Sequence, residues 1–358
     1  MQKPVPRLVL HPFRGKHNPH PLYQYMNKQE LGAQRLTLDQ LEKWEALKFG
    51  MFICFGMSTY DGDELSHGHL PSTAYAPDKL DVDQWVCVAR DAGMKYAVLT
   101  TKHVAGHCLW PTKHNNYHVG TSGNKTDVVE AFVTACEKRG ILPGFYYCSW
   151  DNHNLFGSQT PSHTQDWVAA QPLALASLQL AFTTRAYMDF QTAQIEELLT
   201  QYGQIGEVWI DIPSVLPRFY RQELYDQIAG LQPQALIMMN NGIGDGSEYP
   251  IAHAWPSDLI AIERSLPNSQ TGHVKWRDIE GKKYYLPGEV CDPIGRDWFF
   301  TENDVPRNDE ELLGMVLVCI NRGTNLLLSV GPDKHGLIPD RYITPLQRLR
   351  ANLDKIRA

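Results

Sequence analysis

Short apolar runs alternate with amphipathic segments along most of the chain. The apolar runs have the length of strands and cover residues 48–55, 96–101, 142–147, 207–211, 235–239, 259–263 and 325–330. Between them, apolar positions recur with helical spacing in residues 81–93, 127–140, 182–202, 217–230 and 308–322, and a closing helix begins at Pro345. Continuous apolar runs are typical of parallel strands that are buried on both faces. The pattern therefore predicts strands and helices in alternation around a parallel sheet.

In a chain of 358 residues this alternation favours an α/β fold, a (β/α)8-like barrel of the TIM type, over an open doubly wound sheet. No glycine-rich phosphate loop follows the first strand, which argues against a nucleotide-binding sheet. Residues 1–45 are rich in proline, histidine and polar residues, which predicts an extended N-terminal arm. We expect residues 46–358 to form the barrel and the arm to pack on it. Residues 268–306 predict irregular, aromatic-rich structure. Because the chain ends with its closing helix, we expect no C-terminal β-sandwich.

Composition and charge narrow the class of protein. A hydrophobic content of 43% is enough for a large core and excludes a mainly disordered chain. The net charge of -7 argues against a nucleic acid or an anionic membrane as partner. No apolar stretch approaches the roughly 18 residues that span a bilayer. The 7 cysteines are scattered without CxxC spacing, so we expect neither a disulfide framework nor a structural zinc site.

The N-terminus carries no apolar core followed by a small-residue cleavage site of the kind found in signal peptides. We therefore expect a cytoplasmic protein, or a secreted or periplasmic one if a signal was trimmed. The oligomeric state is not determined by the sequence, and a homo-oligomer remains open.

Two carboxylates stand at the ends of predicted strands. Asp211 closes the run Glu207-Val208-Trp209-Ile210-Asp211, and Glu263 closes Leu259-Ile260-Ala261-Ile262-Glu263. Barrel enzymes keep their chemistry at the C-terminal ends of the strands, and strand alternation points both side chains inward if the Val and Ile positions face the helices. A pair of converging carboxylates is what the cleavage of a glycosidic bond requires. Structural alternatives are a turn-capping Asp211 and a surface ion pair of Glu263 with Arg264.

Further candidates for binding follow the other strands. His103 and His107 come directly after residues 96–101, where a histidine can bind a hydroxyl group. Their spacing also permits a metal site, but a glycine-containing loop is a poor scaffold for one, and we expect no metal. Glu289 is an alternative acid/base. The candidate platforms for stacking on a sugar face are Tyr146, Tyr147, Trp150 and Trp298, which are equally compatible with an ordinary core.

From roughly Leu47 to Pro339 the chain resembles glycoside hydrolase family 29, the α-L-fucosidases. The segments that carry the resemblance occur in the family's order and include Lys48-Phe49-Gly50-Met51-Phe52-Ile53, Ala92-Gly93-Met94-Lys95-Tyr96, Gly144-Phe145-Tyr146-Tyr147, Val208-Trp209-Ile210-Asp211 and Asn325-Leu326-Leu327-Leu328. The resemblance implies a retaining exo-glycosidase without a cofactor, acting on the terminal fucose of an oligosaccharide or glycoconjugate. It implies Asp211 as nucleophile, Glu263 as acid/base, Tyr147 as the active-site tyrosine and Trp298 as the aromatic that packs on the methyl group of the sugar.

The chain departs from the family pattern in its expected sugar pocket. Cys54-Phe55-Gly56 stands where the family has His-Trp-Gly, and His103-Val104-Ala105-Gly106-His107 stands where it has His-His-Asp-Gly-Phe. An arginine that the family carries near Asn240-Asn241 is also missing. Each hydrogen bond lost to a sugar hydroxyl costs on the order of 1 kcal/mol, so the pocket that contains Cys54 must differ. Three alternatives therefore remain: a glycosidase for a related sugar such as an α-L-galactoside, a catalytically weak glycan-binding barrel, and a metal-dependent barrel hydrolase.

Overall fold

The computed structural model describes residues 32–154, 182–249 and 251–357. Eight parallel strands form one sheet in the order β5-β4-β3-β2-β1-β10-β9-β6. The strands are β1 (Phe49–Ile53), β2 (Tyr96–Lys102), β3 (Leu142–Cys148), β4 (Glu207–Asp211), β5 (Leu236–Met239), β6 (Ile260–Glu263), β9 (Gly288–Pro293) and β10 (Thr324–Ser329). An antiparallel hairpin of β7 (Trp276–Ile279) and β8 (Lys282–Tyr285) precedes β9. The predicted α/β barrel class is confirmed.

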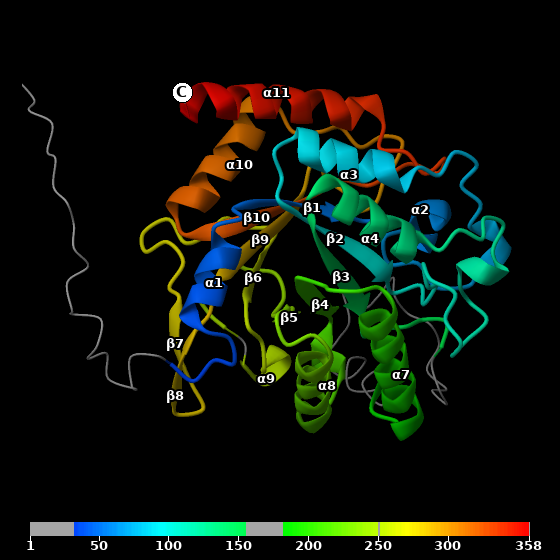
Figure 1. Cartoon of the computed structure of the whole chain (residues 1–358), viewed down its shortest axis with the longest axis horizontal. Coiled ribbons are helices and arrows are strands. Elements are labelled where there is room, and N and C mark those ends of the chain that lie inside the picture. Colours follow the sequence, from blue (N-terminus) through cyan, green and yellow to red (C-terminus); the bar gives the residue numbers. More distant parts are fainter. Residues whose placement is uncertain (1–31, 155–181, 250, 358) are drawn as a thin grey trace, which may run out of the picture.

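The helices lie around the outside of the strands (Figure 1). They are α1 (Leu38–Glu45), α2 (Met57–Asp61), α3 (Val82–Asp91), α4 (Val128–Arg139), α7 (Arg185–Gln201), α8 (Arg218–Leu231), α9 (Ile251–Ala254), α10 (Asp309–Asn321) and α11 (Asp340–Arg357). Their ends follow local chemistry: the side chains of Asp81, Asp127 and Asn308 cap α3, α4 and α10, and Gly140 ends α4 in the left-handed conformation. None of the helices in the described ranges has the length and apolar character needed to cross a membrane.

The barrel closes where its two end strands, β5 and β6, meet. The side-chain amide of Asn241 pairs with the backbone of Ala261 in both directions, donating to its carbonyl at 3.1 Å and accepting from its N–H at 2.8 Å. The N–H of Asp258 donates to the carbonyl of Ile237 at 2.7 Å. Side chains thus supply part of the pairing that the backbone ladder supplies between the other strands.

Two segments differ from the sequence-based expectation. Residues 38–45, expected in an extended arm, form α1, because Thr37 and Gln40 make a capping box and Leu41 and Trp44 are buried. The earlier part of the predicted arm, residues 1–31, lies outside the described residues. The second difference is residues 268–306, predicted to be irregular, which contain the β7–β8 hairpin and β9. Glu289 and Asp292 interrupt the sequence of β9 with charged residues, so β9 does not read as an apolar run.

Candidate active site

A cavity of about 640 Å³ opens at the C-terminal ends of the strands, and both Asp211 and Glu263 line it. Strand alternation explains why Asp211 points into the cavity: Trp209 lies two residues earlier on the same face of β4 and lines the same cavity. The inward direction that the sequence predicts for both carboxylates is therefore the one observed. Asp211 does accept the N–H of Ile212 in the turn that follows β4, as its structural alternative expected, and it lines the cavity as well.

Three hydrogen bonds hold Asp211. The hydroxyl of Tyr146 donates to Oδ2 at 2.6 Å, the backbone N–H of Ile212 donates to Oδ1 at 2.9 Å, and Nδ2 of Asn240 donates to Oδ1 at 2.7 Å. Such donors stabilise the ionised form of a carboxylate and fix its direction. The side chain of Asp211 is therefore fixed in direction and aimed into the cavity.

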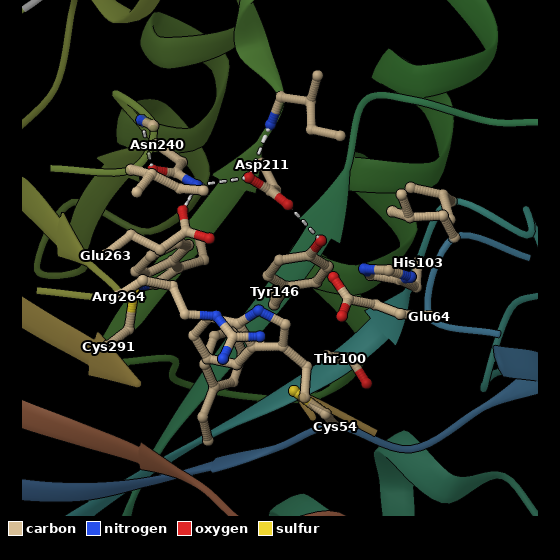
Figure 2. Close-up of a pocket in the computed structure, with 18 of the residues that line it drawn as sticks. Cys54, Glu64, Thr100, His103, Tyr146, Asp211, Asn240, Glu263, Arg264 and Cys291 are labelled. Carbon is tan, nitrogen blue, oxygen red and sulfur yellow. Dashed lines mark hydrogen bonds between the residues drawn. The ribbon is translucent and has the colours of Figure 1, made fainter. Parts of the chain in front are cut away.

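The same nitrogen of Asn240 also donates to Oε2 of Glu263 at 2.9 Å, so one amide lies between the two carboxylates (Figure 2). The distance between Oδ1 of Asp211 and Oε2 of Glu263 therefore cannot exceed the sum of these two hydrogen-bond lengths. Retaining glycosidases keep their two carboxyl groups about 5–5.5 Å apart, and a single amide that touches both carboxylates is compatible with such close placement.

Glu263 is poised to hold a proton near neutral pH. Burial raises its pKa to about 7, the negative charge of Asp211 adds to the effect, and the hydrogen bond from Asn240 opposes it. A carboxylic acid with a pKa close to the working pH can both give and take a proton. The two carboxylates thus have different environments, one held by donors and one buried beside a like charge.

Glu64 is a third carboxylate on the cavity wall, and the sequence analysis missed it. It lies in the loop after α2, where its backbone carbonyl accepts a hydrogen bond from Ser58 at 3.0 Å. Burial raises the pKa of Glu64 to about 7, although the charge of Arg264 lowers it.

The residue after each carboxylate adopts the left-handed backbone conformation, with φ at 49° for Ile212 and 54° for Arg264. This conformation is disfavoured for residues with a Cβ, and especially for a β-branched one such as Ile212. Strain of this kind is typical of sites where tertiary contacts impose a geometry that the local sequence disfavours. Both strands therefore turn sharply directly after delivering their carboxylates.

His103, Cys54 and Trp298 line the cavity as predicted. The ring of His103 stacks on that of Tyr146 with centroids 5.7 Å apart. Burial lowers the pKa of His103 to about 3, so its imidazole is neutral at physiological pH and acts as a hydrogen-bonding group.

Three predicted binding residues lie away from the cavity. Nε2 of His107 lies 2.8 Å from the hydroxyl of Ser122, in a buried cluster outside the barrel mouth. Tyr147 donates its hydroxyl to Gln194 of α7 at 2.7 Å, on the opposite face of β3 from Tyr146. The tyrosine of the site is therefore Tyr146, a one-residue difference in strand register.

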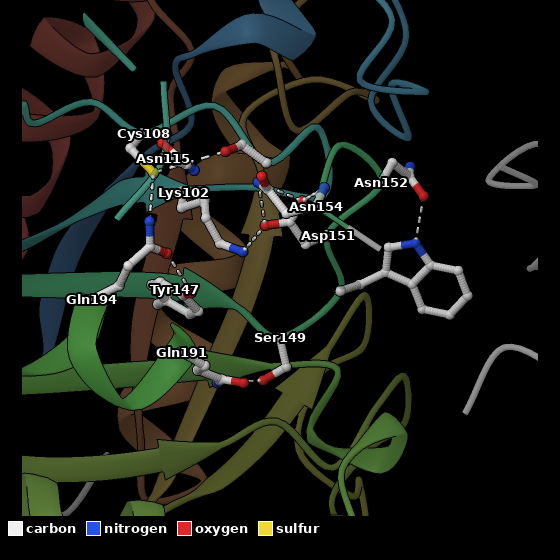
Figure 3. A network of polar contacts seen from close by, with 12 residues as sticks. Lys102, Cys108, Asn115, Tyr147, Ser149, Asp151, Asn152, Asn154, Gln191 and Gln194 are labelled. Carbon is white, nitrogen blue, oxygen red and sulfur yellow. Dashed lines mark hydrogen bonds and ion pairs between the residues drawn. The ribbon is translucent and has the colours of Figure 1, made fainter. Parts of the chain in front are cut away.

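Trp150, the third of these residues, donates its indole N–H to Asn152 at 2.8 Å and is buried outside the cavity. It borders a polar network around Lys102 and Asp151, which form an ion pair of 2.7 Å with both side chains fully buried (Figure 3). Tyr147 belongs to the same network, its ring lying 4.4 Å from the ammonium of Lys102. Tyr147 and Trp150, which were predicted to contact substrate, thus belong to a buried support beside the site.

Glu289, the alternative acid/base, lies too deep to take that role. It stands two residues before Cys291, which lines the cavity, and it faces the barrel interior one layer lower. It accepts hydrogen bonds from the hydroxyl of Tyr96 at 2.6 Å and the indole of Trp209 at 2.8 Å. Its side chain is fully buried, so the prediction for Glu289 is wrong.

No cluster of three or more His, Cys, Asp or Glu side chains suited to a metal ion occurs among the described residues. His103 and His107 do not converge, since one faces the cavity and the other faces Ser122.

Comparison with known proteins links this site to one family. A sequence profile described as Alpha-L-fucosidase matches residues 69–355. The chain is 28% identical over 324 residues to Alpha-L-fucosidase 1 of Arabidopsis thaliana, covering 87% of this chain and 59% of the relative. It is 26% identical over 265 residues to the tissue alpha-L-fucosidase of Bos taurus, covering 72% of this chain and 49% of the relative.

The solved structure of Alpha-L-fucosidase isoenzyme 1 from Paenibacillus thiaminolyticus superposes with a TM-score of 0.70 at 26% identity. The alignment covers 88% of this chain and 75% of that structure. The chain spans little more than half the length of the curated plant relative and about half that of the bovine one.

Proposed function

Because this chain belongs to the α-L-fucosidase family, we propose that it hydrolyses terminal α-L-fucosides with retention of configuration. The single amide that touches both carboxylates is the observation that carries the proposal. One amide in contact with both Asp211 and Glu263 supports a short separation of the two carboxyl groups, of the kind that a covalent intermediate requires. The substrates are the fucose-bearing ends of oligosaccharides or glycoconjugates.

In the first step an oxygen of Asp211 bonds to the anomeric carbon as the glycosidic C–O bond breaks. The acid proton of Glu263 passes to the departing oxygen, so the aglycone leaves as a neutral alcohol and a fucosyl ester remains on Asp211. The pKa of Glu263, raised to about 7, allows it to carry this proton near neutral pH.

In the second step the ionised Glu263 takes a proton from a water molecule, and the oxygen of that water bonds to the anomeric carbon. The ester bond breaks, the electron pair returns to Asp211 and Glu263 is again protonated. Two inversions at one carbon give net retention. Tyr146 and Asn240 keep the nucleophile aimed throughout, since both donate to its oxygens.

Hydrolysis of an aryl α-L-fucoside by the native chain and by Asp211→Ala tests this assignment. We expect loss of at least about 10³-fold in kcat for the variant, because the covalent route is closed. Azide should restore turnover and give the β-fucosyl azide, since azide can enter from the face that Asp211 occupied. As a control, Asp226→Ala removes an exposed carboxylate on α8 and should behave as the native chain.

The other outcomes identify the alternatives. Faster cleavage of the matching aryl α-L-galactoside would reassign the sugar without changing the mechanism. Glycan binding that is unaffected by Asp211→Asn, with no turnover of any glycoside by the native chain, would contradict the enzymatic proposal.

A further inference from the structure

Arg264 lines the cavity together with Glu263, although the two residues are adjacent in the sequence. In a regular strand successive side chains point to opposite faces, so an extended Arg264 would point away from Glu263. The left-handed backbone at Arg264, with φ at 54°, removes that constraint. Its backbone N–H donates to the carbonyl of Cys291 at 3.1 Å, which anchors the turn to β9.

Two contacts hold the guanidinium of Arg264 in place. Its central carbon lies 4.9 Å from the ring centroid of Trp298, and Nη1 donates to the backbone carbonyl of Arg296 at 2.6 Å. Figure 2 shows the side chain reaching inward from the end of β6, below Glu263. A guanidinium carries five N–H donors, and the bond to Arg296 uses one of them. The group is therefore preorganised, with donors left for a ligand.

The charge of Arg264 is unusual for this cavity. Arg264 is the only lysine or arginine among the described residues that line it, whereas Glu64, Asp211 and Glu263 contribute three carboxyl groups to the same cavity. Its charge lowers the pKa of Glu64 and of Glu263 against the stronger effect of burial. The guanidinium thus lies within electrostatic range of Glu64 and Glu263, two of the three acids that face the cavity.

We propose that Arg264 is a substrate-binding residue whose guanidinium donates hydrogen bonds to ring hydroxyls of the sugar bound between Glu64 and Glu263. The proposal rests on the proposed function and adds a determinant of affinity to the same site. The fork of N–H groups suits a pair of neighbouring hydroxyl oxygens, and the Trp298 ring keeps the fork from turning away. Arg264 also reduces the repulsion among the carboxylates while the sugar is bound.

Steady-state kinetics of Arg264→Gln and Arg264→Lys on an aryl α-L-fucoside test the proposal. We expect Arg264→Gln to raise KM by about 10- to 100-fold with a smaller loss in kcat, because it loses charge-assisted bonds to substrate. Arg264→Lys keeps the charge but loses the planar fork, so its KM should be intermediate. Arg90→Gln, which removes the same charge from the exposed face of α3, is the matched control.

The pH profile separates a binding role from a purely structural one. Removing the charge of Arg264 raises the pKa of Glu263, so the acid stays protonated to higher pH. The alkaline limb of kcat/KM should therefore move to higher pH in Arg264→Gln and stay in place in Arg264→Lys. A KM and an alkaline limb in Arg264→Gln equal to those of the native chain would overturn the proposal and leave the fucosidase assignment intact.

Direct binding of L-fucose, followed by tryptophan fluorescence, tests Arg264 without turnover, because Trp209 and Trp298 line the cavity. We expect Arg264→Gln to weaken this binding by a factor similar to the change in KM. If the native chain binds L-fucose but cleaves no fucoside, the proposed function fails while weaker binding by the variant still supports Arg264. Equal binding by both proteins would sink the Arg264 proposal in either case.

Discussion

A single side-chain nitrogen, Nδ2 of Asn240, holds both carboxylates of the site. It donates one hydrogen to Asp211 and the other to Glu263, while Oδ1 accepts the backbone N–H of Gly242 at 2.9 Å. That third bond fixes which end of the amide faces the carboxylates. Aspartate has nearly the same shape but no donor, so it cannot replace Asn240. At this scale, the spacing of the acids depends on one amide.

We predict that Asn240→Ala lowers kcat/KM by about 10- to 100-fold, because two charge-assisted hydrogen bonds are lost. The bond from Asn240 lowers the pKa of Glu263, so its removal raises that pKa and moves the alkaline limb of kcat/KM to higher pH. Asn240→Asp should be worse, since it adds a third negative charge between the acids. Asn116→Ala, at an exposed position, serves as control, and an unshifted alkaline limb in Asn240→Ala would contradict the argument.

At the scale of elements, the end of β2 serves two purposes. The pairing of β2 with β3 shifts register between Thr100 and Lys102, an irregularity that re-aims the following side chains. Lys102 is consequently buried against Asp151, which follows β3, and His103 faces the cavity. Asp151 also accepts the backbone N–H of Asn154 at 2.7 Å. The ion pair thus ties the end of β2 to the segment after β3.

We predict that Lys102→Met lowers the free energy of unfolding by about 3–5 kcal/mol, because it leaves the carboxylate of Asp151 buried without its cation. The double variant Lys102→Met/Asp151→Asn should lose less, since no uncompensated charge remains. Urea unfolding followed by tryptophan fluorescence measures both. If Lys102→Met proved as stable as the native chain, the pair would not be the support inferred here.

At the scale of the whole molecule, a second pair of acids lies within the barrel below the cavity. Glu207 of β4 accepts the indole N–H of Trp44 at 3.2 Å, and Glu289 of β9 accepts the hydroxyl of Tyr96 and the indole N–H of Trp209. Burial and the charge of Glu289 raise the pKa of Glu207 well above its ordinary value, and burial raises that of Glu289 to about 7. β4 and β9, which lie on opposite sides of the barrel, are therefore joined through Glu207 and Glu289. The burial of these two side chains favours their protonated forms.

This pair should make the fold less stable as the pH rises. In the unfolded chain both glutamates lose their protons near pH 4.3, whereas the folded chain keeps them to higher pH. Between about pH 5 and 8 the folded state therefore binds more protons, and its stability falls by up to about 1.4 kcal/mol per pH unit for each extra proton. Glu64 and Glu263 add to the same trend.

Thermal unfolding from pH 5 to 8 measures this slope. Glu207→Gln keeps a donor toward Glu289 without a proton to lose, so we expect a flatter pH dependence with little loss of stability at pH 5. If the stability of Glu207→Gln fell with pH as steeply as that of the native chain, Glu207 would be excluded as a source of the pH dependence.

The amino-acid sequence by itself determined the barrel class, most of the strands and helices, and the inward direction of Asp211 and Glu263. These follow from periodicity and capping, which act over a few neighbouring residues. His103 was also found from its place at the end of a strand, whereas Cys54 and Trp298 were indicated by the family resemblance. β9 escaped detection because charged residues interrupt it, and its Glu289 faces the barrel interior, where Tyr96 and Trp209 from other strands satisfy it.

Only the tertiary structure decided that Tyr146 rather than Tyr147 reaches Asp211, that Asn240 joins the two acids, and that Glu64 and Arg264 face the cavity. It also decided that Glu289 lies too deep and that His107 faces away. Each of these depends on strand register around the barrel or on the path of a loop, and both are set by contacts between residues far apart in the sequence. Local patterns carry no information on such contacts.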